Sequence, residues 1–314
     1  MARYVKISAI APRPHEIDPH KDLAACVDEM IRHWDSCLEN VLCDHPDLVV
    51  LPEACDRPPN FPLELRLAYY AARGDRILRH MMDVARANHC HIAYSAASSL
   101  PDGTFRNSTQ FINRQGAIDG IYNKNHLVPS EYTQAGILYG KEAPVIQTDF
   151  GTVAGVICFD LNFRELCAKY EQSRPELLVF SSMYHGGLMQ NYWAYACRAW
   201  FIGSVAGDQC TVINPLGDLV ARSTNYYPYV TTDINLDCRV VHIDNNNAKF
   251  AAAKQKYGSR IKIHDPGHVG AVLISSECDG LSIQEVIREF DITLWDDYYA
   301  RSLAHRHEPG HIEP

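Results

Sequence analysis

The chain has 314 residues, enough for one large α/β domain or two domains of ordinary size. Its 29 basic against 38 acidic residues give a formal net charge of −9, which argues against a basic face for nucleic-acid phosphates. Its apolar runs fall far short of the roughly 20 residues of a membrane helix, and the first residues read as a strand rather than a signal peptide. We therefore expect a globular protein that binds neither nucleic acid nor a membrane.

The first third of the chain alternates strand-like and helix-like segments. Residues 23–42 carry apolar side chains at the spacing of an amphipathic helix, whereas residues 47–51 form a short apolar run that Pro52 ends. Such a run is typical of a strand buried on both faces. The expected elements here are a strand at 4–10, a helix at 23–42, a strand at 47–51, a helix at 75–88 and a strand at 91–97.

Hairpin-like pairs of strands follow in the middle of the chain. Because hairpins there follow alternating strands and helices, we expect a mixed sheet rather than a purely parallel one. No linker interrupts the chain, so we expect a single domain over 1–314 with a C-terminal extension from about 245 to 314. The expected elements are strand pairs at 104–113 with 117–123, 144–148 with 153–158 and 211–214 with 219–223, helices at 163–172 and 191–201, a strand at 177–182, and an extended tail at 305–311.

Eleven cysteines are many for this length, but their number is odd and none forms a CxxC pair. Without a secretory signal, such a set indicates reduced thiols packed as small apolar side chains. The sequence therefore predicts a reducing, cytoplasmic compartment.

The first candidate functional residue is Glu53, in the segment Leu48-Val-Val-Leu-Pro-Glu53. A carboxylate at the end of a strand buried on both faces is costly unless it is partnered, and burial raises its pKa. Such a group suits a general base that works near neutral pH. The alternative is a glutamate that caps the next turn.

Lys124 and Cys158 also stand at the ends of strand-like segments. Lys124 ends Ile121-Tyr-Asn-Lys124, where an ammonium would stabilise a developing oxyanion; the alternative is a solvated surface lysine. Cys158 ends Gly155-Val-Ile-Cys158 just before a helix, where backbone N–H groups and the helix N-terminus would lower the thiol pKa from about 8.5. The N–H of Phe159 would then face an oxyanion. The alternative is a buried structural cysteine.

These three segments, in this order, resemble the carbon–nitrogen hydrolase (nitrilase) superfamily. The resemblance is carried by 50–53 (Val-Leu-Pro-Glu), 122–126 (Tyr-Asn-Lys-Asn-His) and 155–160 (Gly-Val-Ile-Cys-Phe-Asp), with lesser support from 106–108 (Arg-Asn-Ser). It extends over about residues 5–231.

The resemblance implies an α/β fold, a four-layer α-β-β-α sandwich with two mixed β-sheets, and a Glu-Lys-Cys triad between the sheets. In it, Glu53 is the general base, Cys158 the nucleophile and Lys124 the cation that stabilises the tetrahedral intermediate. Glu131 matches a further glutamate that helps to hold substrate and orient the base. Covalent catalysis of this kind needs no metal and no organic cofactor.

The resemblance also implies hydrolysis of a non-peptide C–N bond in a small carboxamide through a cysteine thioester, with release of ammonia or an amine. Nitrilases usually have Trp-Glu after the cysteine, whereas Phe159-Asp160 is similar to the amidase and carbamoylase branches. Several branches place an arginine three or four residues past the cysteine to hold a carboxylate, but those positions here are Leu161 and Asn162. We therefore expect a neutral or weakly polar amide rather than an N-carbamoyl amino acid.

In the resemblance, residues 181–189 line the substrate pocket, and Tyr184 and His185 could hydrogen-bond the acyl part; the alternative is an ordinary loop. Family members usually pair through helices whose counterparts here are 163–172 and 191–201. A homodimer or higher homo-oligomer is therefore expected.

Other functions stay open at this point. A nitrilase or an N-carbamoyl amide hydrolase would use the same triad, an acyltransferase would pass the acyl group to an amine, and a catalytically silent binding or scaffold protein would keep only the fold. Histidine is a common metal ligand, and the candidates for a metal site are His89, His91 and the tail residues His305, His307 and His311. No ligand spacing completes a zinc set, so we expect solvated histidines and no metal.

Overall fold

The computed structural model describes residues 1–100 and 102–313. The chain divides into two compact units, one formed by Val5–Ile234 and the other by Met1–Tyr4 with Asn235–Pro314. Each is described below by itself. The single domain with an extension from about 245 stays a prediction.

Two six-stranded sheets form the larger unit. In each sheet the central strands are parallel and the outer hairpins antiparallel, so both sheets are mixed, as expected. The first sheet has the order β12 (Tyr229–Asn235), β1 (Tyr4–Ile10), β2 (Leu48–Val50), β3 (His91–Ser99), β4 (Phe105–Ile112) and β5 (Ile118–Asn123). The second has the order β11 (Leu219–Arg222), β10 (Cys210–Ile213), β9 (Trp200–Val205), β8 (Leu177–Ser182), β7 (Thr152–Ile157) and β6 (Ile146–Gln147).

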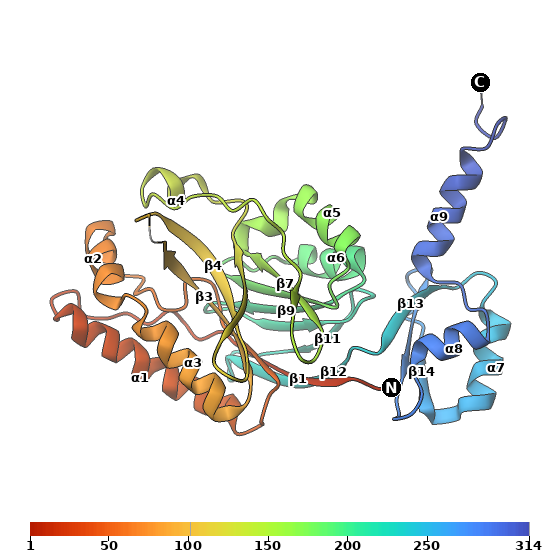
Figure 1. Ribbon diagram of the computed structural model, residues 1–314, viewed down its shortest axis with the longest axis horizontal. Coiled ribbons are helices and arrows are strands. Elements are labelled where there is room, and N and C mark those ends of the chain that lie inside the picture. Colours follow the sequence, from red (N-terminus) through yellow and green to blue (C-terminus); the bar gives the residue numbers. More distant parts are fainter. Residues whose placement is uncertain (101, 314) are drawn as a thin grey trace. The chain divides into compact units, whose positions relative to one another are not determined.

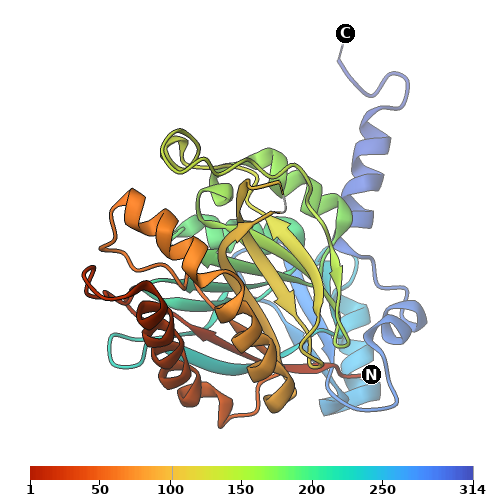
Figure 2. The same cartoon turned by 60° about the vertical axis from the view of Figure 1, so that its left-hand side comes forward.

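Helices cover the outer face of each sheet, which gives the expected four-layer α-β-β-α sandwich (Figures 1 and 2). The helices on the first sheet are α1 (Leu23–Leu42), α2 (Leu63–Arg73) and α3 (Arg76–Asn88), and those on the second are α5 (Arg164–Ser173) and α6 (Leu188–Cys197). The short helix α4 (Pro129–Thr133) follows β5, and a 3₁₀ helix, Cys158–Asn162, follows β7.

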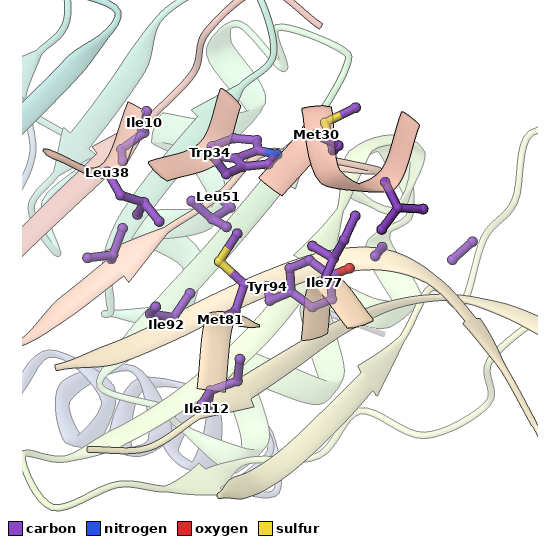
Figure 3. Close-up of a cluster of buried hydrophobic side chains, with 14 of the residues drawn as sticks. Ile10, Met30, Trp34, Leu38, Leu51, Ile77, Met81, Ile92, Tyr94 and Ile112 are labelled. Atoms are coloured by element: carbon purple, nitrogen blue, oxygen red, sulfur yellow. The ribbon is translucent and has the colours of Figure 1, made fainter. Parts of the chain in front are cut away.

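One core of the larger unit lies between the first sheet and its helices (Figure 3). Trp34 and Met30 of α1 and Met81 of α3 pack there against Leu51 and Ile92. Each large apolar side chain that is fully buried contributes roughly 1.5–3 kcal/mol, so this layer holds the strands that carry the site in a fixed position.

The predicted C-terminal end of the helix at residues 191–201 is wrong. Helix α6 ends at Cys197 because Arg198 adopts a left-handed conformation with φ of 55°, and the fully buried strand β9 begins at Trp200. A short apolar run of this kind cannot be told from a buried helix by periodicity. Helix α2 and strand β12 were likewise not expected from the sequence.

The smaller unit contains a three-stranded antiparallel sheet in the order β13 (Cys238–His242), β15 (Ala271–Ser276) and β14 (Ile261–His264). Its core joins Val241 and Ile274 of this sheet to Val286 of a helix. The tail expected to be extended at 305–311 is helical as far as Arg306. The helices of this unit are α7 (Asn247–Tyr257), a 3₁₀ turn at Gly258–Arg260, α8 (Ile283–Glu289) and α9 (Trp295–Arg306), which runs from the sheet toward the C-terminus (Figure 1).

Within 1–100 and 102–313, every helix is too short or too polar to span a bilayer.

Candidate active site

Glu53 lies on a segment that is fixed at several points. Pro52 stands just past the end of β2, and two residues after Glu53 the N–H of Cys55 donates to the Ser95 carbonyl at 2.9 Å. The Cys55 carbonyl in turn accepts the Trp34 indole N–H at 2.9 Å. These bonds hold the Glu53 carboxylate inside the unit, where the residue is only 5% exposed.

Lys124 follows β5 directly, and its N–H donates to the Asn107 carbonyl at 2.8 Å. Its side chain is 1% exposed, and its Nζ donates to Glu53 Oε1 at 2.8 Å and to Glu131 Oε2 at 2.7 Å. Burial lowers the pKa of the Lys124 ammonium, but the charges of Glu53 and Glu131 outweigh burial and raise the pKa above its ordinary value. The lysine is therefore a fixed cation.

Cys158 lies at the junction of β7 and the following 3₁₀ helix, with a φ of +49°. Its thiol lies close enough to the Glu53 carboxylate and to the N–H of Met183, which follows β8, for both to influence the pKa of the thiol. Segments remote in sequence thus meet in one place. Glu53 and Lys124 are buried, and Glu131 and Cys158 beside them are half-buried; we call these four residues the buried cluster.

Three further donors hold the two carboxylates of the buried cluster. Asn107 donates its Nδ2 to Glu53 Oε1 at 2.8 Å and to Glu131 Oε1 at 2.9 Å. The backbone N–H of Met183 donates to Glu53 Oε2 at 3.1 Å, and that of Val128 donates to Glu131 Oε2 at 2.8 Å. Sequence reasoning gave these groups no role, although Asn107 lies in the segment 106–108 that supports the resemblance and is a polar residue within a buried strand. The backbone N–H groups of Met183 and Val128 could not be recognised from the sequence, because almost every residue type carries one.

The pKa expected for Glu53 was wrong in direction. Burial raises the pKa of Glu53, but the Lys124 charge and the bonds from Lys124, Cys158 and Asn107 outweigh it and bring the pKa below its ordinary value. The carboxylate is therefore ionised at neutral pH and can accept a proton.

The expectation for Cys158 was also wrong in direction. Burial, followed by the charge of Glu53, raises the pKa of the Cys158 thiol to about 12, although Lys124 opposes this. The helix N-terminus does not compensate for a neighbouring carboxylate. The sulfur thus carries its proton at rest and has a base in contact with it.

The turn at Cys158 is braced by the fully buried Asp160. Its Oδ2 accepts the Tyr122 hydroxyl at 2.6 Å and the Ile157 N–H at 3.1 Å. Its Oδ1 accepts the His126 N–H at 2.7 Å and lies 2.9 Å from the ring Nδ1 of the same histidine. One carboxylate therefore joins the end of β7 to the segment that follows β5.

The structure does not connect Tyr184 and His185 to the buried cluster by any hydrogen bond among the residues it describes. The Tyr184 N–H donates to Ser182, the two rings lie 4.7 Å apart, and His185 borders a different cavity of about 270 Å³. Phe159, half-buried, occupies the first turn of the 3₁₀ helix, where backbone N–H groups lack an acceptor within the helix. The binding roles of all three stay predictions.

A cavity of about 260 Å³ adjoins the buried cluster, because Glu131 lines it together with Asn107, which donates to Glu53. The rest of its wall includes Arg57, from the segment after Glu53, and Arg66 on α2.

The expectation of solvated histidines is wrong for His91, which is 3% exposed and hydrogen-bonded to Asp149 at 2.9 Å. In the tail, one nitrogen each of His305 and His311 and an oxygen of Glu308 lie within 4.8 Å of one another, all three residues being exposed. All eleven cysteines are free.

Known proteins resemble the chain in sequence and in fold. The sequence profile of the family described as Carbon-nitrogen hydrolase matches residues 18–237. Deaminated glutathione amidase of Mus musculus is 27% identical over 253 residues, which cover 69% of this chain and 73% of the mouse protein.

Two solved structures show the fold. A carbon–nitrogen hydrolase from Helicobacter pylori G27 is 17% identical with a TM-score of 0.63, covering 75% of this chain and 90% of the other. A mutant of the amidase from Nesterenkonia sp. AN1, with the acetamide moiety of fluoroacetamide added covalently at its active-site cysteine, is 15% identical with a TM-score of 0.59, covering 74% and 90%. Because the family profile spans well over half of the sequence, the chain belongs to the carbon–nitrogen hydrolase family, the nitrilase superfamily of enzymes that hydrolyse carbon–nitrogen bonds other than peptide bonds.

Proposed function

We propose that the protein hydrolyses a small carboxamide through a thioester on Cys158. The observation that carries the proposal is that Glu53 accepts a hydrogen bond from the Lys124 ammonium and lies near enough to the Cys158 thiol for each to shift the pKa of the other. A protonated sulfur, an ionised carboxylate and a fixed cation are the groups that acyl transfer to a thiol needs.

The first half of the reaction forms the thioester. Glu53 takes the proton of the Cys158 thiol as the sulfur attacks the amide carbonyl carbon. The carbonyl electron pair moves onto oxygen, and the resulting oxyanion is stabilised by Lys124 and the Phe159 N–H. As the intermediate collapses, the protonated Glu53 gives its proton to the nitrogen, the C–N bond breaks, and ammonia or an amine leaves.

The second half returns the enzyme to its starting state. Glu53 takes a proton from water while the water oxygen attacks the thioester carbonyl. The C–S bond then breaks, the acid is released, and the proton on Glu53 returns to the Cys158 thiolate. Glu131 keeps Lys124 in place and, with Asn107, limits the rotation of Glu53.

An amide is favoured over a nitrile as the substrate. Phe159-Asp160 follows the cysteine where nitrilases usually have Trp-Glu, and the mouse relative is named an amidase. The Nesterenkonia structure bears an acetamide moiety on its cysteine, which is the residue type that we propose as the nucleophile here.

The test is Cys158-dependent ammonia release from a panel of amides, nitriles and N-carbamoyl amino acids. Cys158→Ala should abolish release, and mass spectrometry of the wild type should find an acyl adduct on the peptide that contains Cys158. Cys43→Ala is the matched control, because Cys43 is an exposed cysteine beyond the end of α1. Wild-type protein that forms no adduct and releases no ammonia with any of these compounds would leave the binding or scaffold alternative. Transfer of the acyl group to an added amine in preference to water would identify an acyltransferase.

Two further properties belong to this proposal. We infer a homodimer or larger homo-oligomer that forms through the region of α5 and α6. We also infer a reducing, cytoplasmic setting, which the eleven free cysteines support.

A further inference from the structure

The end of the smaller unit gathers three side chains that are able to ligate a metal ion. His305, Glu308 and His311 each offer one ligand atom, and these three atoms lie within 4.8 Å of one another. Among residues 1–100 and 102–313 this is the one set of three histidine, cysteine or acidic side chains arranged in this way. Two imidazoles and a carboxylate are a donor set that suits Zn²⁺.

A turn that the sequence specifies brings two of these ligands together. The N–H of His311 donates to the Glu308 carbonyl at 3.1 Å and closes a four-residue turn. Pro309 and Gly310 occupy the middle of the turn, and Gly310 has a φ of +82°. Proline followed by a glycine with positive φ is the sequence of a type II turn. As a result, Nε2 of His311 lies 3.8 Å from an oxygen of Glu308.

A hydrogen bond fixes which nitrogen of His311 is available to a metal. Its Nδ1 lies 2.7 Å from the carbonyl oxygen of His305. A carbonyl only accepts, so Nδ1 carries the proton and donates, and Nε2 of the neutral ring keeps its lone pair. Histidines that bind metals are commonly oriented in this way, by an N–H bond to a carbonyl or a carboxylate. The nitrogen close to Glu308 is therefore the one that is able to ligate.

The electrostatics of the helix end also favour a cation here. Helix α9 ends at Arg306, its last turn contains His305, and Glu308 lies just beyond it. The C-terminal end of a helix carries negative partial charge, which disfavours a carboxylate and stabilises a cation. A divalent ion beside Glu308 would thus be attracted by the carboxylate and by the end of α9 together.

We propose that His305, Glu308 and His311 bind a divalent transition-metal ion, for which Zn²⁺ is the best fit. Ligand atoms at 2.0–2.2 Å from Zn²⁺ are roughly 3.3–3.6 Å apart in a tetrahedron, so small rotations of the three exposed side chains complete the set. Water fills the remaining position. Binding joins the last turn of α9 to the turn that follows it and fixes this end of the chain.

This site is independent of the proposed amide hydrolysis. Its residues belong to the smaller unit, whereas the buried cluster belongs to the larger one. The proposal replaces the expectation that the tail histidines are solvated and bind no metal. The spacing of the ligands gave no zinc motif, because the turn at Pro309 and Gly310 brings them together.

Calorimetric titration of the full chain with Zn²⁺ tests the proposal. His305→Gln, Glu308→Gln and His311→Gln should each weaken Zn²⁺ binding by about tenfold or more, since loss of even an outer partner of a metal site commonly costs about 10- to 100-fold. His307→Gln is the matched control, because His307 is an exposed histidine of the same segment that lies outside the set. It should bind Zn²⁺ as the wild type does.

A fourth variant tests the turn without removing a ligand. No other atom lies within 4 Å of the position where a Cβ would stand on Gly310, so only its positive φ opposes a side chain. Gly310→Ala should therefore weaken Zn²⁺ binding by about threefold or more, because alanine disfavours this backbone conformation. Unchanged binding by Gly310→Ala would show that the turn does not hold the ligands in place, against the proposal.

Two further measurements locate the metal. The eleven free cysteines are competing ligands, and Co²⁺ held by them would show thiolate charge-transfer absorption, whereas Co²⁺ at the proposed site would show none. Zn²⁺ should also slow trypsin cleavage after Arg306, which lies between two of the ligands, in the wild type but not in His311→Gln.

Two results would overturn the inference. One is Zn²⁺ binding that is equal in the wild type and in the three ligand variants, or that saturates only at Zn²⁺ concentrations on the order of 1 mM, which would indicate an adventitious ion only. The other is a thiolate band that accounts for all of the bound Co²⁺, which would assign the metal to cysteine.

Discussion

Glu53 and Cys158, the base and the nucleophile that we propose, have pKa values shifted in opposite directions. The bonds to Glu53 bring its pKa below the ordinary value, whereas burial and the Glu53 charge raise that of Cys158 to about 12. The resting pair is therefore a carboxylate and a thiol, and the proton moves only when the sulfur attacks. This differs from a preformed thiolate, which would be open to oxidation whenever substrate is absent.

The first prediction at this scale concerns pH. Below the pKa of Glu53 the base is protonated, so kcat/KM should fall as pH drops below the ordinary glutamate value of 4.5, and stay level through neutrality. Neither the thiol, with a pKa of about 12, nor Lys124, whose pKa is raised, loses its proton near pH 8. Stopped assays across pH, with enzyme stability checked at each point, measure the profile. An acid limb centred near pH 6.5–7 would contradict the low pKa of Glu53.

The second prediction concerns Asn107. Asn107→Ala removes one hydrogen bond from each of the Glu53 and Glu131 carboxylates, and such bonds to charged groups are worth about 1.5–3 kcal/mol. We expect kcat/KM to fall by about 10- to 100-fold. Because the Asn107 bond lowers the pKa of Glu53, the acid limb should also move to higher pH. A loss of activity with the limb unmoved would show that the residue serves another purpose.

The sequence predicted the residues of the buried cluster but not their electrostatics. Glu53, Lys124 and Cys158 were singled out because each ends a strand, and strand ends are visible as a change of pattern. Whether each pKa is raised or lowered depends on which of these side chains lie next to one another, and only the folded structure determines that.

At the scale of elements, the fold was predictable where periodicity extends over several turns or where a hairpin has a clear turn. Helix α1 was expected at its observed limits of Leu23 and Leu42, since apolar side chains recur along its whole length. The boundary between α6 and β9 was not, because the chain passes from a buried helix to a buried strand through only Arg198 and Ala199. The order of the strands was not predictable from the residues either, because pairing depends on contacts far apart in sequence.

The prediction at the scale of elements concerns the hydrogen bonds between His126, in the segment after β5, and Asp160, in the turn after β7. Burial lowers the pKa of His126, but its bonds to Asp160 and Glu165 outweigh burial and raise the pKa above the ordinary 6.5. The protonated histidine therefore stabilises the fold fully below pH 6.5, and this contribution is lost as pH rises through the raised folded pKa. His126→Gln should lower Tm most at pH 5–6 and least above pH 8, measured by thermal unfolding at a series of pH values. A difference in Tm that grows with pH would contradict this linkage.

At the scale of the whole molecule, the larger unit carries the buried cluster, and its α6 region exposes apolar side chains. Leu188 at the start of α6 is 81% exposed, and the nearby Met183 and Tyr192 are also exposed. A group of this kind on a folded protein often marks a contact with another copy.

The prediction is that Leu188→Asp weakens the proposed homo-oligomer. Burial of a new carboxylate at a contact between copies is unfavourable, so the apparent mass should decrease at concentrations where the wild type is associated. Light scattering coupled to size-exclusion chromatography measures this. Leu303→Asp, which changes an exposed leucine on α9, is the matched control. A wild type that is monomeric at every concentration would contradict the proposal.

The left-handed backbone conformation of Cys158 lowers the stability of the fold, which matters when variants are selected for stability. Side chains disfavour a φ of +49°, and glycine alone adopts it freely. Cys158→Gly should therefore melt at a higher temperature than Cys158→Ala, although neither has a nucleophile. A position where glycine would favour stability is thus occupied by the nucleophile that we propose, and a selection for thermostable variants that scores folding alone would tend to replace Cys158.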